Sequence, residues 1–112
     1  MKQIIDKIKA EIKKKGFNRD KIVPMLKGLR EYFKENLKQP GLVVMIRLAY
    51  ENIESNGEYT FLYLEEEKGK VNLEYFIDLL ADYSNKYNSE ELKEIRNLME
   101  GKVPEDIEEN EI

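Results

Sequence analysis

The sequence predicts an all-α fold, a compact bundle of about five helices around a central apolar helix at residues 42–55. Three observations predict it. Apolar residues recur at three- and four-residue spacing in several separate stretches. Short breaks rich in proline, glycine or asparagine separate these stretches. Of the 112 residues, 38% are charged, which suits helices with a solvated outer face. We therefore expect residues 1–101 to form a single helical domain and the acidic residues 102–112 to form a disordered tail.

The first two helices are indicated by their apolar stripes. Between Lys2 and Lys15, isoleucines share one helical face and most lysines lie off it. Gly16 then predicts the end of this helix. The second helix is expected to begin near Val23, because proline costs about 3 kcal/mol in a helix interior and the next residue is Pro24. Its apolar stripe continues to Leu37.

The third segment is the most apolar of the chain. Residues 39–41 read Gln-Pro-Gly, which predicts a sharp turn between helices. In residues 42–55, apolar side chains cover most of the helical wheel, and Arg47, Glu51 and Glu54 make the polar wedge. A helix that is apolar nearly all round is typical of the centre of a bundle. We therefore expect the other helices to cover it on nearly every side.

The stretch at residues 58–71 does not follow the helical pattern. Residues 59–64 have the aromatic and β-branched content of a strand, whereas the glutamates that follow do not. We interpret this stretch as an irregular or short β-like connection. Asn72 is then expected to cap a helix over residues 73–87, and a final helix follows over residues 90–100.

Composition excludes several kinds of chemistry. The chain has no cysteine, no histidine and no tryptophan, so thiolate nucleophiles, imidazole bases and their metal sites are impossible. Glu74, Asp78 and Asp82 form an acidic ladder on one helical face. We interpret this ladder as a solvated face, because one calcium ion needs six to eight oxygen ligands from several directions. We predict no catalytic residue, no cofactor and no metal site, and therefore no enzyme.

The chain also lacks the patterns of targeting and membrane insertion. The longest apolar run covers residues 42–46, whereas a membrane span needs about 20 residues. The N-terminal segment has no continuous apolar stretch of the kind that signal peptides contain. These patterns predict no membrane partner and a cytoplasmic location.

The tyrosines suggest a contact surface. The chain has seven of them, concentrated in its second half, and tyrosine is enriched at protein interfaces. We identify Tyr59, Phe61, Tyr63 and Tyr75 as candidate partner-binding residues, with edges of the core as the simpler interpretation. Tyr75 lies on the polar side of its predicted helix, where folding alone does not require an aromatic residue. The leading hypothesis is a non-enzymatic protein–protein interaction or regulatory module, with a homodimer as one form of it.

Charge is divided between the two halves of the chain. The net charge is +6 over residues 1–56 and -10 over residues 57–112. The halves could lie against each other, associate between subunits or bind a polyanion. The best polyanion candidates are the four cations of one helical arc, Lys27, Arg30, Lys34 and Lys38. The alternative function is therefore non-specific nucleic-acid binding through the basic half.

Overall fold

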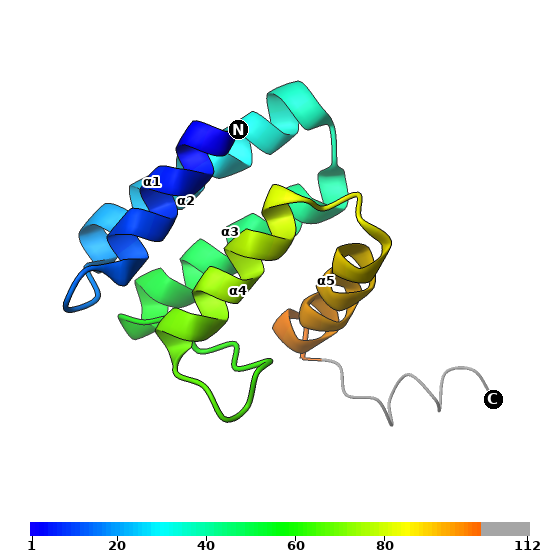
Figure 1. Cartoon of the computed structure of the whole chain (residues 1–112). Helices are drawn as coiled ribbons and strands as arrows, with labels where there is room; N and C mark the ends of the chain where they lie inside the picture. Colours follow the sequence, from blue (N-terminus) through cyan, green and yellow to red (C-terminus); the bar gives the residue numbers. More distant parts are fainter. Residues whose placement is uncertain (102–112) are drawn as a thin grey trace.

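The computed structural model describes residues 1–101, and these form five α-helices without a strand among them (Figure 1). The helices are α1 (Lys2–Lys13), α2 (Arg19–Tyr32), α3 (Pro40–Asn56), α4 (Gly69–Ala81) and α5 (Lys86–Met99), and a π-helical turn, η1 (Phe33–Leu37), extends α2. The predicted all-α bundle is confirmed. The predicted tail at residues 102–112 lies outside the described residues. Within the described part, no helix is both long and apolar enough to cross a membrane.

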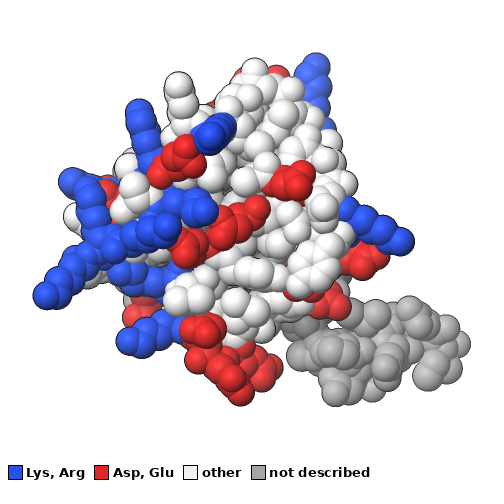
Figure 2. All heavy atoms as spheres, viewed as in Figure 1, with Lys and Arg blue, Asp and Glu red and all other residues white. Residues whose placement is uncertain are grey.

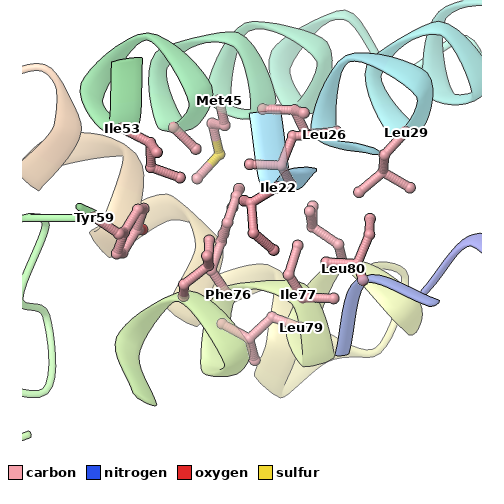
Figure 3. Close-up of a cluster of buried hydrophobic side chains, with 14 of the residues drawn as sticks. Ile22, Leu26, Leu29, Met45, Ile53, Tyr59, Phe76, Ile77, Leu79 and Leu80 are labelled. Atoms are coloured by element: carbon pink, nitrogen blue, oxygen red, sulfur yellow. The ribbon is translucent and has the colours of Figure 1, made fainter. Parts of the chain in front are cut away.

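The helices surround one hydrophobic core. The helix α1 packs against α2 and α4, α2 packs against α3, and α5 contacts both α3 and α4 (Figure 1). In the centre, side chains of α2 and α3 face those of α4, and the ring of Tyr59 lies at one end (Figure 3). The largest fully buried residues include Phe33, Phe76 and Ile22.

The helix α2 begins four residues earlier than the sequence predicts. Asn18 is its N-cap, and the Asn18 carbonyl accepts hydrogen bonds from the backbone N–H groups of Lys21 and Ile22. Pro24 lies inside the helix on its exposed side. A proline removes the bond to the carbonyl four residues back, here that of Asp20, an exposed residue whose carbonyl can bind water instead. The early start buries Ile22, which offsets this loss.

Burial of α3 is less complete than the sequence predicts. Its fully buried residues are Met45, Ile46, Ala49 and Ile53. Val44 and Leu48 are only half-buried on its outer side. The helix α4 is buried along more of its surface, because α1 covers one flank and α5 the other. The centre of the bundle is therefore shared between α3 and α4.

The break between α4 and α5 also differs from the prediction. The helix α4 ends at Ala81, and Asn85 is the N-cap of α5, where its side chain accepts a bond from the Asn88 N–H at 3.2 Å. Between them, the ring of Tyr83 lies 5.7 Å from that of Phe33. Tyr83 therefore lies outside both helices, where its ring packs on Phe33. The chain turns at residues 82–85 rather than after residue 87.

Candidate functional site

The connection between α3 and α4 is irregular, as the sequence predicts, but the two helices hold it firmly. Residues 57–68 belong to no helix or strand. From α3, the side chain of Asn52 bonds Thr60 twice. Its Oδ1 accepts from the Thr60 N–H at 2.8 Å, and its Nδ2 donates to Thr60 Oγ1 at 2.7 Å. These bonds fix the first half of the connection.

Asn72 of α4 holds the second half. Its side chain is buried, with 3% of the residue exposed. Its Oδ1 accepts from the Leu64 N–H at 2.7 Å, and its Nδ2 lies 3.1, 3.2 and 3.1 Å from the carbonyl oxygens of Leu64, Glu67 and Lys68. The prediction that Asn72 caps the helix is wrong, because it is the fourth residue of α4. It replaces the backbone partners that an irregular loop lacks.

Gly69 allows α4 to start directly against the connection. A Cβ atom at this position would lie 2.2 Å from the carbonyl oxygen of Tyr59. Tyr59 itself is 2% exposed, and its ring centroid is 5.6 Å from that of Phe61 and 6.5 Å from that of Phe76. Tyr59 is therefore part of the core, where burial raises the pKa of its hydroxyl.

Beyond these anchors, Tyr63 and Tyr75 meet α5. Their rings are stacked, with centroids 6.2 Å apart and planes 14° from parallel. The Tyr75 hydroxyl donates to Glu91 Oε1 at 2.5 Å. The Tyr63 hydroxyl lies 2.7 Å from Glu91 Oε2 and also within bonding reach of Glu94. A phenol has one proton, so Tyr63 donates to one of these two carboxylates at a time.

Tyr87 completes this tyrosine–glutamate cluster, which we define as Tyr63, Tyr75, Tyr87, Glu91 and Glu94. The Tyr87 hydroxyl is 3.3 Å from Glu91 Oε1. Unlike the other two tyrosines, Tyr87 is 63% exposed. On α5, residues 87, 91, 94 and 98 recur at four- and three-residue spacing and so share one face.

The hydrogen bonds oppose a change of protonation in the cluster. Partial burial raises the pKa of Tyr63 and Tyr75 above the ordinary value, and their hydrogen bonds to the glutamates raise it further. The hydroxyl groups of Tyr75 and Tyr63 in turn lower the pKa of Glu91. The phenols therefore stay neutral and Glu91 stays ionised at neutral pH.

This protonation pattern suits binding better than catalysis. A general acid among carboxylates needs a raised pKa, and a phenol that acts as a base needs a lowered one. In the cluster the pKa of the carboxylate Glu91 is lowered and the pKa values of the phenols Tyr63 and Tyr75 are raised, which is the opposite of both requirements. The cluster therefore offers a stacked aromatic surface beside the ionised Glu91, held in place by hydrogen bonds.

The structure brings together only some of the predicted contact residues. Tyr63 and Tyr75 adjoin each other as a pair, and Phe61 is half-buried against the core. Tyr59 is too buried to belong to an accessible surface. Sequence reasoning missed Tyr87, Glu91 and Glu94, because the predicted break after residue 87 placed Tyr87 on a different helix from the two glutamates, whereas α5 contains all three. The unusual position of Tyr75 is explained by its bond to Glu91.

The predicted basic arc does not persist as a continuous surface. The Lys27 ammonium is 3.6 Å from Glu54 and lies 5.4 Å from the ring centroid of Tyr50. Arg30 pairs with Glu31 at 3.1 Å. At Phe33 the helix becomes π-helical, so Lys34 and Lys38 no longer follow the α-helical spacing that defined the arc. Glutamates therefore neutralise two of the four cations, and the other two are displaced.

The basic and acidic halves of the chain meet at α1 and α4. Lys9 Nζ is 2.7 Å from Asp78 Oδ1, and Lys13 Nζ is 3.8 Å from Glu74 Oε2. Two members of the acidic ladder thus face lysines of α1. Figure 2 shows lysines and arginines gathered mainly on the α1 side of this view, with acidic and uncharged residues over α4 and α5. Part of the positive charge of the first half of the chain is therefore paired with negative charge of the second half within the fold.

Neither metal-site geometry nor comparison assigns a chemistry to the chain. Within residues 1–101, no group of three or more acidic side chains is placed to hold a metal ion. No protein-family model matches the chain, and no curated protein or solved structure matches it either.

Proposed function

We propose that this protein is a non-enzymatic protein–protein interaction module of the cytoplasm whose contact surface is the tyrosine–glutamate cluster with Leu98. The observation that carries the proposal is the exposure of Tyr87. This ring is 63% exposed and adjoins two stacked tyrosines that hydrogen bonds hold in place. Leu98, on the same face of α5, is 38% exposed.

Such a surface has the properties of an interface centre. Tyrosine is enriched among the residues that dominate binding energy, because its large ring loses little conformational freedom on binding. Here Tyr63 and Tyr75 are already ordered by their bonds to Glu91, so less freedom remains to be lost. Tyr87 and Leu98 supply apolar area that the fold leaves in contact with water.

The charge of the surface favours a basic partner. Glu94 is exposed three residues after the half-buried Glu91, and the second half of the chain is strongly acidic. A partner that carries lysine or arginine around an apolar centre would complement it. Charge complementarity of this kind mainly sets the rate of association and its dependence on salt.

The test is affinity capture with two matched variants. The double variant Tyr87→Ala/Leu98→Ser removes the exposed apolar groups of the surface. The control, Leu62→Ser, removes an equally exposed leucine that lines a groove with Phe17 and Lys70 instead. We expect proteins captured by the native chain and by the control to be lost from the double variant, while the helical circular dichroism of all three stays unchanged.

Two results would contradict the proposal. Capture of the same proteins by the double variant would show that this surface is not the contact site. Retention on duplex DNA that falls steeply with salt, and that is weakened by Lys34→Gln/Lys38→Gln, would favour the nucleic-acid alternative. The molar mass in solution is measured on the same samples, because a dimer that the double variant dissociates would make a second copy the partner.

A further inference from the structure

A separate cavity lies between the start of α3 and the side of α5. Its volume is about 200 Å³, which is the liquid volume of roughly seven water molecules. Leu42 and Met45 of α3 and Leu92 of α5 form its apolar wall. Lys93 and Arg96 on α5 also line it. At 100° per residue, these two cations lie on the flank of α5 away from Glu94, so the cavity is distinct from the tyrosine–glutamate cluster.

The charges that line this cavity are all positive. Among residues 1–101, no aspartate or glutamate lines the cavity. Two other pockets of the described residues differ, because Glu58 lines one and Asp20 and Glu54 line the other. The hydroxyl-bearing side chains of Tyr83 and Ser89 also line the cavity. The polar side chains of the cavity therefore offer more hydrogen-bond donors than acceptors.

The two cations are also incompletely neutralised by the described residues. Lys93 makes no ion pair with any of residues 1–101. Arg96 is paired through Nε with Glu100 at 3.5 Å. Its Nη1 points the other way, toward α3, where a Cβ atom on Gly41 would lie 2.9 Å from it. Gly41 thus leaves space for the guanidinium at the edge of the cavity.

We propose that this cavity binds a small aliphatic carboxylate, with the carboxylate at Lys93 and Arg96 and the stem against Leu42, Met45 and Leu92. A guanidinium matches the planar geometry of a carboxylate. An apolar wall favours a hydrocarbon stem over a bare inorganic anion, and the volume has room for a ligand of about seven non-hydrogen atoms. This inference does not depend on the proposed contact surface.

The test is a titration followed by NMR of the ¹⁵N-labelled full chain. Sodium pentanoate matches the size of the cavity, inorganic phosphate has charge without a stem, and pentanamide has the stem without charge. We expect pentanoate to shift the backbone amides of Gly41, Leu42, Lys93 and Arg96 with a millimolar Kd. We expect phosphate to bind more weakly and pentanamide to leave these amides unshifted.

A matched pair of variants separates the cavity from general charge. Arg96→Gln removes the cation at the cavity, and Arg47→Gln removes an arginine in the same kind of pair, with Glu51 four residues later, on the exposed side of α3. We expect Arg96→Gln to raise the Kd for pentanoate about tenfold, Lys93→Gln to raise it less, and Arg47→Gln to leave it unchanged. Equal shifts with pentanamide, equal Kd values for Arg96→Gln and Arg47→Gln, or no saturable shift at all would overturn the proposal.

Discussion

At the scale of single residues, Glu91 is the acceptor on which the tyrosine–glutamate cluster depends. Three phenol groups lie within bonding reach of its carboxylate. Because these bonds favour the ionised form, the pKa of Glu91 in the folded protein is below its ordinary value of 4.5. A carboxylate with a lowered folded-state pKa contributes stability that is fully present above the unfolded-state pKa and is lost as pH falls through the folded-state value.

We therefore expect Glu91→Gln to lower the free energy of unfolding at neutral pH. We also expect the free energy of unfolding of this variant to fall less steeply in acid than that of the native chain. The difference in slope should appear below about pH 5, where Glu91 of the unfolded chain begins to bind a proton. Urea denaturation of the native chain and the variant, from about pH 7 to about pH 3, measures both effects. Glu90→Gln, an exposed neighbour, is the control. Parallel pH profiles for the native chain and Glu91→Gln would contradict the assignment.

Asn72 is the second residue whose side chain decides local structure. Replacement by alanine removes the partner of the Leu64 N–H and of the carbonyl groups near it. A buried polar group without a partner costs about 1–3 kcal/mol, so we expect Asn72→Ala to lower the free energy of unfolding by about 2–4 kcal/mol. Chemical denaturation measures this change, and faster hydrogen exchange at Leu64 locates it. A loss below about 0.5 kcal/mol would show that water replaces the side chain without cost.

At the scale of elements, the start of α4 is set by close contact rather than by helix propensity. A Cβ atom at Gly69 would approach the Tyr59 carbonyl to 2.2 Å, and a backbone oxygen cannot rotate away as a flexible side chain can. We expect Gly69→Ala to lower the free energy of unfolding by about 1–3 kcal/mol, because the connection must shift. The matched change Gly28→Ala meets no atom within 4 Å inside α2.

Gly28→Ala should therefore act in the opposite direction. Alanine restricts the unfolded chain and favours the helix, so we expect a gain of about 0.5–1 kcal/mol. Urea denaturation of the two variants under one condition gives the comparison. If both alanine variants were stabilised, the close contact at Gly69 would not exist in solution.

The helices also show where sequence periodicity reaches its limit. The stripes of isoleucine and leucine in α1, α4 and α5 predicted these helices, because burial of one face is a local pattern. The start of α2 was predicted too late, because the cost of Pro24 is local whereas the burial of Ile22 depends on the helices that pack against α2. The end of α4 was predicted too late for the same reason, since only contact with Phe33 shows that Tyr83 leaves the helix.

At the scale of the whole molecule, the basic first half and the acidic second half of the chain form ion pairs where α1 contacts α4. The Asp78 side chain is 49% exposed, and that of Lys9 is 31% exposed. Their hydrogen bond raises the pKa of Lys9. Exposed ion pairs contribute about 0.2–1 kcal/mol, and salt screens them. The pairing therefore orients α1 on α4 more than it stabilises the fold.

From this pairing we expect Asp78→Asn to lower the free energy of unfolding by less than about 1 kcal/mol at low salt. The difference from the native chain should shrink at about 1 M sodium chloride, where the screening length is about 3 Å. Asp82→Asn serves as the control, because Asp82 lies directly after the end of α4 and has no ion pair to any of residues 1–101. A loss that is equal for both variants, or independent of salt, would contradict a specific pair at Asp78.

The sequence by itself determined the helical class, the apolar stripes of α1, α4 and α5, the irregular connection and the absence of thiol and imidazole chemistry, because periodicity and composition are properties of the chain alone. Only the tertiary structure decided that α4 shares the centre with α3, that Tyr59 lies in the core and that Tyr63, Tyr75 and Tyr87 meet one glutamate on α5. Those outcomes depend on which residues, distant in the chain, come within a few ångströms of one another. Tyr63 and Glu91 are 28 positions apart, and no local pattern records that distance.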